Sequence, residues 1–244
     1  MSGVAPKVLY IYNEHLATEA LLGEAFADSG FGVDTFEVVP AERVDSPAVD
    51  VTFPDPTGYD VIVPLGARWP VYDDALRRTW VGAETQLLRE AADAGVALLG
   101  VCFGGQLLAE AFGGSVTRSS TPEIGWHDVD TDHPDLVPGG PWFQWHFDRW
   151  TLPPGATEIA RTANASQAFV LDRALALQFH PEINLKLLDS WLNDDRDGEV
   201  VGAGLSHDQL RDRTIELADD AAARIRGLVQ GFLTHVAGQP RPSS

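Results

Sequence analysis

The single cysteine of the chain, Cys102, lies in a segment that suits a nucleophile. It stands in Gly-Val-Cys-Phe-Gly-Gly-Gln (100–106), between an apolar run and a helical pattern. A nucleophile in a sharp strand-to-helix turn is lifted above the sheet edge, where backbone N–H groups at the helix N-terminus stabilise a thiolate and an oxyanion. Glycines on both sides are what such a strained turn needs. We interpret Cys102 as a catalytic nucleophile; the alternative is a small buried core residue.

A catalytic cysteine needs a base, because a free thiol with a pKa of about 8.5 is mostly protonated at neutral pH. Among seven histidines, His180 is the best candidate, since Leu-Gln-Phe-His-Pro-Glu (177–182) ends an apolar run. The ends of parallel strands meet at one rim of a sheet, which would bring His180 toward Cys102. Glu182 could hydrogen-bond the far imidazole nitrogen and favour the imidazolium. The alternatives are a buried structural histidine and a solvated surface acid.

The elements that must position these side chains alternate between apolar runs and helical patterns. The apolar runs predict strands at 8–12, 33–39, 59–64 and 96–101, and the helical patterns predict helices at 17–29, 79–94 and 106–112. Strand, helix, strand in this rhythm indicates right-handed crossovers and a mostly parallel sheet with helices on both faces. We therefore expect an open, three-layer α/β fold.

The pattern changes after Gly114, where short extended runs are separated by Pro and Gly turns. Five such runs (124–129, 142–147, 156–160, 167–171 and 174–179), the last two joined by a hairpin turn, predict an antiparallel extension of the sheet. A helix follows at 183–193, then an acidic loop at 194–206. A long helix at 207–236 carries an apolar stripe that would pack on the domain or on another subunit. We expect one domain over 1–193 and a C-terminal extension over 194–244 packed on it.

Charge and cysteine content exclude several classes of protein. Among 244 residues, 17 Lys and Arg oppose 36 Asp and Glu, a net charge of −19. This balance argues against nucleic acid and against an anionic membrane surface as partners. One cysteine excludes an internal disulfide and a multi-cysteine metal site, and we expect no metal or cofactor. Without a targeting signal or an apolar run of about 20 residues, we expect a cytoplasmic protein.

The segments 100–106 and 178–182 resemble the class I (triad) glutamine amidotransferases, especially their stand-alone, GMP-synthase-like domains. Three further segments agree: Val-Pro-Leu-Gly-Ala-Arg-Trp-Pro (63–70) at the family's oxyanion loop, Gln-Trp-His-Phe-Asp (144–148) at its His-x-Asp segment, and Pro-Glu-Ile-Gly-Trp (122–126). The resemblance covers roughly residues 8–192. It implies a flavodoxin-like fold with an antiparallel extension and a C-terminal helix.

The resemblance also implies a mechanism. Cys102 would attack the γ-carboxamide of glutamine, and His180 would protonate the departing ammonia, leaving a γ-glutamyl thioester. Water activated by His180 would then release glutamate. The oxyanion would be held by the backbone N–H of Phe103 and by one from the loop at Gly66 and Ala67, an arrangement that contributes about 2.7–4 kcal/mol per donor in other enzymes.

The substrate-binding residues follow from the same resemblance. Gln106 would line the glutamine pocket, and the backbone of His146, Phe147 and Asp148 would meet the α-amino and α-carboxylate groups. Phe147 replaces the glycine common in the family, which reshapes that wall. His146 is equally a candidate structural hydrogen-bonder, and we interpret His127 as structural.

The oxyanion loop departs from the family pattern of two glycines and a proline, because the chain has Gly66, Ala67 and Arg68. Ala67 can still donate its N–H from an ordinary backbone conformation. Arg68 could reach a carboxylate of a γ-glutamyl substrate larger than glutamine; the alternative is a surface arginine.

Three functions stay open at this point. The chain could be an amidotransferase subunit that supplies ammonia to a separate synthase, because we expect a glutaminase domain in this sequence and no acceptor domain fused to it. It could instead be a free-standing hydrolase of γ-glutamyl amides or peptides with the same triad. It could also be a binding or regulatory protein with little turnover, and a homo-oligomer is open in each case.

Overall fold

The computed structural model describes residues 5–195 and 198–238, and places nine strands in one sheet. The strands are β1 (Lys7–Tyr12), β2 (Gly32–Glu37), β3 (Val61–Pro64), β4 (Ala97–Val101), β5 (Ser115–Thr131), β6 (Gly140–Thr151), β7 (Thr157–Arg161), β8 (Ser166–Leu171) and β9 (Ala174–Leu177). The α-helices are α1 (Ala20–Asp28), α2 (Asp74–Arg77), α3 (Trp80–Asp93), α4 (Phe103–Ala111), α5 (Leu185–Asn193), α6 (Glu199–Gly202), α7 (His207–Glu216) and α8 (Ala218–Phe232). The ends of the two predicted domains, 1–4 and 239–244, lie outside the described residues.

The sheet has the order β2-β1-β3-β4-β9-β8-β7-β5-β6. The first five strands pair in parallel, and the remaining pairs are antiparallel. The predicted mostly parallel sheet with an antiparallel extension is therefore confirmed. The parallel strands β3, β4 and β9 are buried along their whole length, which explains their continuous apolar sequences.

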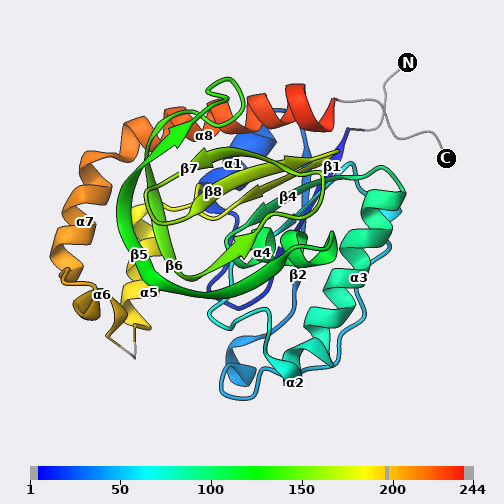
Figure 1. Cartoon of the computed structure of the whole chain (residues 1–244), viewed down its shortest axis with the longest axis horizontal. Helices are drawn as coiled ribbons and strands as arrows, with labels where there is room; N and C mark the ends of the chain where they lie inside the picture. Colours follow the sequence, from blue (N-terminus) through cyan, green and yellow to red (C-terminus); the bar gives the residue numbers. More distant parts are fainter. Residues whose placement is uncertain (1–4, 196–197, 239–244) are drawn as a thin grey trace.

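Helices cover both faces of the parallel part, as the three-layer prediction requires (Figure 1). On one face, α1 and α8 pack through Phe26 and Phe232, whose ring centroids are 6.3 Å apart. On the other face, α3 and α4 bury residues such as Trp80 and Leu107. The central parallel strands therefore lie between two apolar cores.

The strands β5 and β6 form a long curved ribbon that extends beyond the other strands (Figure 1). A third apolar cluster lies against this ribbon and joins it to α5, α6 and α7 through residues such as Phe143, Leu188, Val200 and Leu210. This cluster brings the C-terminal part of the chain to the carboxyl ends of the parallel strands.

Two predicted C-terminal elements are wrong in detail. The predicted loop at 194–206 contains α6, because the Asp195 carboxylate accepts hydrogen bonds from the first helical N–H groups and Val200 is buried. The predicted helix at 207–236 is divided at Leu217 into α7 and α8, followed by a π-helical turn at Leu233–Ala237. The two halves bury different faces in different clusters, so Ile215 of the predicted stripe is 57% exposed.

The strand predicted at 124–129 lies in the C-terminal half of the much longer β5. The N-terminal half is mostly polar and exposed, with Val116 and Ser119 buried, and the ladder with β6 is interrupted between Arg118 and Glu123. A strand segment with so few buried apolar residues gives no alternating apolar signal, so the sequence pattern did not show this half.

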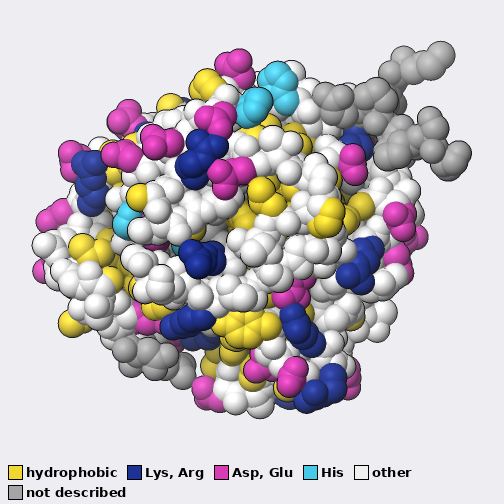
Figure 2. All heavy atoms as spheres, viewed as in Figure 1, with side chains coloured by type: hydrophobic (Ala, Val, Ile, Leu, Met, Phe, Trp, Pro, Cys, Tyr) yellow, Lys and Arg dark blue, Asp and Glu magenta, His cyan; other side chains and the backbone are white. Residues whose placement is uncertain are grey.

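Acidic side chains are concentrated along one edge of the molecule. Figure 2 shows Asp and Glu side chains gathered along the edge formed by α7 and α8, with Lys and Arg side chains lying singly across the same face. Within residues 5–195 and 198–238, no helix has both the length and the apolar character needed to cross a membrane.

Candidate active site

Cys102 occupies a strained turn between β4 and α4. Its φ is 50° and its ψ is −106°, in the left-handed half of conformational space that L-residues rarely adopt. Its N–H donates to the Leu177 carbonyl at 2.8 Å, and its carbonyl accepts from the Gln106 N–H at 2.9 Å. The tight turn predicted from the flanking glycines is therefore present, and it holds the thiol at the N-terminus of α4.

Gly104 allows α4 to approach the sheet closely enough for this turn. A Cβ at Gly104 would lie 2.0 Å from the backbone oxygen of Pro64, at the end of β3. Gly66, two residues after Pro64, has an equally specific place, because a Cβ there would lie 3.1 Å from Cε1 of His180. The predicted oxyanion loop therefore lies directly against the predicted base.

His180 and Glu182 form a buried hydrogen-bonded pair. Nδ1 of His180 lies 2.7 Å from Oε1 of Glu182, and the two residues are 5% and 2% exposed. The His180 N–H donates to the Phe143 carbonyl at 2.8 Å, so β6 fixes the backbone of this segment. The Trp191 ring meets the imidazole edge-on, with centroids 4.8 Å apart.

The charge state of His180 follows from its neighbours. Burial lowers the pKa of His180, but the charges of Glu182 and of the Cys102 thiolate, with hydrogen bonds to both, outweigh burial and raise it to about 10. The arrangement therefore favours an imidazolium form of His180 at neutral pH. Such an imidazolium can give a proton to a leaving group.

A glutamine amide and a backbone carbonyl lie beside the sulfur. Gln178 Nε2 lies 3.7 Å from Sγ of Cys102, and Sγ lies 3.9 Å from the Trp145 carbonyl oxygen. Gln106, the predicted pocket residue, is buried and its Nε2 lies 3.4 Å from Oε1 of Gln178. Gln178 thus links Gln106 to the thiol.

Cys102, His180 and Glu182 line one cavity of about 490 Å³. Every residue predicted for catalysis or substrate binding lines it except Phe103, whose buried ring packs against Trp80 at 5.5 Å between centroids. The role predicted for Phe103 uses only its backbone N–H. The lining residues predicted from the sequence are Gly66, Ala67, Arg68, Cys102, Gln106, His146, Phe147, Asp148, His180 and Glu182.

The His146–Asp148 segment is held by its own hydrogen bonds. Nδ1 of His146 lies 3.0 Å from the Asp148 carbonyl oxygen, and Nε2 lies 3.2 Å from a carboxylate oxygen of Glu123. Burial raises the pKa of Glu123, but His146 and other partners outweigh burial and lower it overall. With Nδ1 hydrogen-bonded and Nε2 beside a carboxylate, the His146 ring has the contacts of the structural alternative, although the residue also lines the cavity.

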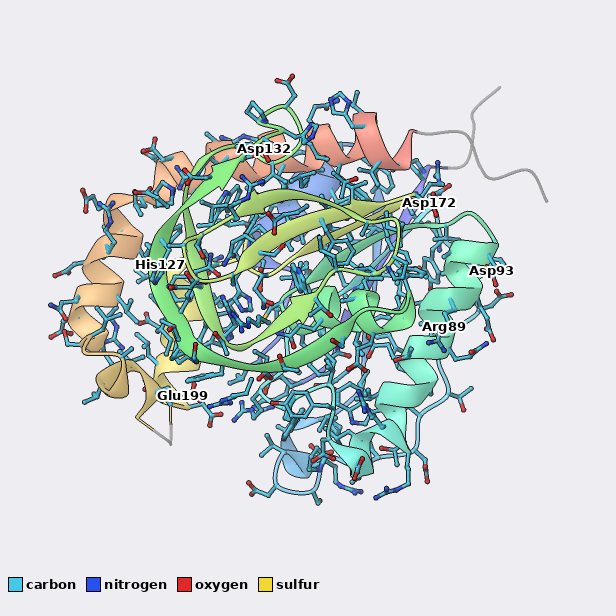
Figure 3. All side chains as sticks on the ribbon, in the orientation of Figure 1. Arg89, Asp93, His127, Asp132, Asp172 and Glu199 are labelled. Atoms are coloured by element: carbon cyan, nitrogen blue, oxygen red, sulfur yellow. The ribbon has the colours of Figure 1, made fainter. Side chains whose placement is uncertain are left out.

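Arg68 is already engaged by two carboxylates. Its Nε lies 2.5 Å from Glu14 and its Nη1 lies 2.6 Å from Asp194. Arg68 is not simply a surface arginine, because it lines the cavity. It is also not free to bind a substrate carboxylate, because Glu14 and Asp194 already balance its charge. His127 lies on β5 (Figure 3) with Nε2 3.0 Å from the Ile124 carbonyl oxygen, in line with a structural role.

Several cavity residues were not predicted from the sequence. They come from distant elements: Glu14, Trp69, Arg118, Trp145, Trp191, Asp195 and Glu199. Glu199 on α6 (Figure 3) accepts a 2.6 Å hydrogen bond from Nε1 of Trp145, which ties the C-terminal part of the chain to the cavity wall. Trp145 lies within the Gln-Trp-His-Phe-Asp motif, but nothing local in the sequence signals most of the others. Among the described residues, no group of three or more His, Cys, Asp or Glu side chains is arranged to hold a metal ion.

Comparison with known proteins identifies the family of the chain. Residues 60–195, more than half of the chain, match the model of the glutamine amidotransferase class-I family. The chain therefore belongs to the class I glutamine amidotransferases, as its motifs predicted, and its curated relatives are named as glutamine-hydrolysing enzymes.

A GMP synthase (glutamine-hydrolysing) of Aeropyrum pernix is 30% identical over 171 residues, which are 64% of this chain and 31% of the relative. A GMP synthase of Thermomicrobium roseum is 41% identical over 100 residues, 37% of this chain and 19% of the relative. The chain thus spans less than a third of the length of these relatives.

Solved structures match the fold over nearly the whole chain. A glutamine amidotransferase from Thermotoga maritima has a TM-score of 0.79 and 24% identity, covering 97% of this chain and 100% of that one. A glutamine amidotransferase from Methylobacillus flagellatus has a TM-score of 0.79 and 23% identity, covering 99% and 98%. The C-terminal helices therefore belong to the shared fold.

Proposed function

We propose that the chain hydrolyses the γ-amide of glutamine through a Cys102–His180–Glu182 triad and a γ-glutamyl thioester. The observation that carries this proposal is the buried imidazole of His180, which faces the Cys102 thiol on one side and is bonded to Glu182 at 2.7 Å on the other. This arrangement supports the proposal, because an activated nucleophile needs a base within reach and a third group that orients the base.

The reaction balances in two steps. The Cys102 thiolate attacks the γ-carbonyl carbon, the C–N bond breaks, and the His180 imidazolium gives its proton to the leaving nitrogen, which departs as ammonia. A water then loses a proton to His180 and attacks the thioester, the C–S bond breaks, and glutamate leaves. The sum is glutamine and water converted to glutamate and ammonia.

Two backbone donors would hold the oxyanion, the N–H of Phe103 at the start of α4 and one from the Gly66–Ala67 loop. Support comes from the close approach of Gly66 to both partners, since a Cβ at Gly66 would lie 3.1 Å from Cε1 of His180 and 3.9 Å from Cβ of Cys102. Donors fixed by a helix and a loop need no reorganisation when the oxyanion forms.

We further propose that the ammonia is used by a separate synthase partner. The curated relatives are GMP synthases, and a structure from Thermoplasma acidophilum that is named for one subunit of a GMP synthase is 25% identical with a TM-score of 0.53. A synthase that adds nitrogen to an activated carbonyl is the class of acceptor that these names suggest.

A second candidate function is hydrolysis of a γ-glutamyl amide larger than glutamine. The cavity of about 490 Å³ lies in the range that holds drug-sized ligands, about 300–1,000 Å³, and Trp69, Trp145 and Trp191 line it. A larger leaving amine would have room there.

A substrate screen with purified protein tests both candidates. Glutamine and γ-glutamyl dipeptides are supplied to the wild type and to Cys102→Ala, and glutamate release is measured with and without cell extract. We expect glutamate from the wild type and at least about a 10⁴-fold lower rate from Cys102→Ala. Strong stimulation by an extract protein favours the function with a synthase partner, unaided dipeptide cleavage favours the second candidate, and no release under any condition contradicts both.

A further inference from the structure

The cavity contains two arginines and seven acidic residues, and the two arginines differ in their partners. Arg68 bridges Glu14 and Asp194, so its charge is balanced by the chain itself. Within the described residues, no carboxylate forms an ion pair with the Arg118 side chain. Of the two arginines in the cavity, Arg118 is therefore the one whose charge is not balanced by a carboxylate of the described residues.

Arg118 is nevertheless held in place. Its Cζ lies 4.6 Å from the centroid of the Phe147 ring, a cation–π contact that holds the guanidinium at the cavity wall. Asp148 stands opposite Arg118 in the β5–β6 register, but its Oδ1 accepts a 3.0 Å hydrogen bond from the Tyr72 hydroxyl. The carboxylate closest in register is thus engaged elsewhere.

Cys102 and Arg118 line the same cavity, and the strand β6 runs past both of them. The Trp145 carbonyl oxygen is 3.9 Å from Sγ, and Phe147 follows two residues later, about 7 Å along the strand β6. Four carbon–carbon bonds of about 1.5 Å separate the γ-carbonyl carbon of glutamine from its α-carboxylate carbon. In an extended chain these two carbons are about 5 Å apart. With the γ-carbonyl at the thiol, the α-carboxylate would come within reach of a guanidinium beside Phe147.

We propose that Arg118, oriented by Phe147, binds the α-carboxylate of the γ-glutamyl substrate. The inference rests on the proposed function and adds a binding residue to it. A planar guanidinium pairs with a carboxylate through two parallel hydrogen bonds, which gives orientation as well as affinity. The proposal also explains the aromatic residue at position 147, since a glycine there could not hold the guanidinium.

Direct binding tests this proposal without turnover. Calorimetry in a Cys102→Ala background compares Arg118→Gln with Arg149→Gln, an exposed arginine on β6 that does not line the cavity. The ligands are glutamine and L-glutaminamide, in which the α-carboxylate is a neutral amide. We expect Arg118→Gln to weaken glutamine binding about 10- to 100-fold and to leave glutaminamide binding nearly unchanged, while Arg149→Gln changes neither.

A second ligand pair distinguishes the α-carboxylate of the glutamyl group from a carboxylate on the leaving group. γ-Glutamylglycine and γ-glutamylglycinamide share the α-carboxylate and differ in the leaving group, so Arg118→Gln should weaken both by the same factor. A loss confined to γ-glutamylglycine would move Arg118 to the leaving group and overturn the proposal. The proposal would also be overturned if Arg118→Gln and Arg149→Gln bound glutamine equally well, or if the Cys102→Ala protein bound none of the ligands. The proposed function fails separately, through the absence of glutamate release by the wild type.

Discussion

At the scale of single residues, the site depends on how one imidazole is surrounded. Burial alone would leave His180 neutral, yet Glu182 and the Cys102 thiolate raise its pKa to about 10. The same histidine must give a proton in the first proposed step and take one in the second. Glu182 suits both steps, because its hydrogen bond at Nδ1 presents the other nitrogen toward the thiol.

Replacing Glu182 by glutamine should lower the pKa of His180. In Glu182→Gln the negative charge is lost while burial remains, so we expect the pKa to fall from about 10 toward the ordinary value of about 6.5. An NMR titration of the imidazole measures this pKa. Asp219→Asn, an exposed acid on α8 outside the cavity, serves as the control and should leave the pKa of His180 in place. An unchanged value in Glu182→Gln would remove Glu182 from the proposed triad.

The sequence allowed some site residues to be predicted because their signals are local. Cys102 has its glycines within two residues, and His180 has Pro181 and Glu182 beside it at the end of an apolar run. Arg118 and Trp191 had no such signal, since their places depend on strand pairing and helix packing between distant parts of the chain. The engagement of Arg68 by Asp194 was hidden for the same reason.

At the scale of elements, the site is made by β3, β4 and β9 ending at one rim and by α4 starting there. The parallel register sets Val101 beside Leu177, which places Cys102 next to the segment that carries His180. The β5–β6 ribbon then adds a wall that the parallel sheet lacks. Apolar runs that alternate with helical patterns were sufficient to predict that these strands end at one edge of the sheet. The division between α7 and α8 was not predictable, because only packing distinguishes the buried faces of the two helices.

Gly104→Ala should destabilise the fold by at least about 2 kcal/mol, because the added Cβ would lie 2.0 Å from the backbone of Pro64 and force α4 away from β3. Urea unfolding followed by circular dichroism measures the change. Gly202→Ala is the matched control, since nothing lies within 4 Å of a Cβ there and its free energy of unfolding should change by no more than about 0.5 kcal/mol. Equal stability of the two variants would show that α4 does not approach β3 this closely.

At the scale of the whole molecule, one buried acid links stability to pH. Glu84 on α3 is fully buried, and burial raises its pKa to about 8 although Asn13 partly offsets the effect. Asn13 also donates to the Leu65 carbonyl at 3.0 Å, next to the Gly66 loop. The core that supports the proposed oxyanion loop therefore contains a carboxyl group that is mostly protonated at neutral pH.

This acid should make the protein less stable as pH rises. The unfolded chain releases the Glu84 proton near pH 4.5 and the folded protein near pH 8, so the stability is complete below about pH 4.5 and falls until about pH 8. Glu84→Gln removes this titration, and we expect the wild type to lose on the order of a few kcal/mol relative to the variant between these values. Chemical unfolding at several pH values measures the difference; a constant difference would contradict a buried, protonated Glu84.

The central claim is that Cys102 forms a γ-glutamyl thioester, and acid-quenched mass spectrometry tests it most directly. Wild-type protein mixed with glutamine and quenched during turnover should carry the mass of one γ-glutamyl group on the peptide that contains Cys102. Cys102→Ala should carry none, and His180→Ala should accumulate it about 10² to 10⁴ times more slowly. Continued glutamate release without any adduct at Cys102, or equal glutamate release by Cys102→Ala, would contradict covalent catalysis by this cysteine.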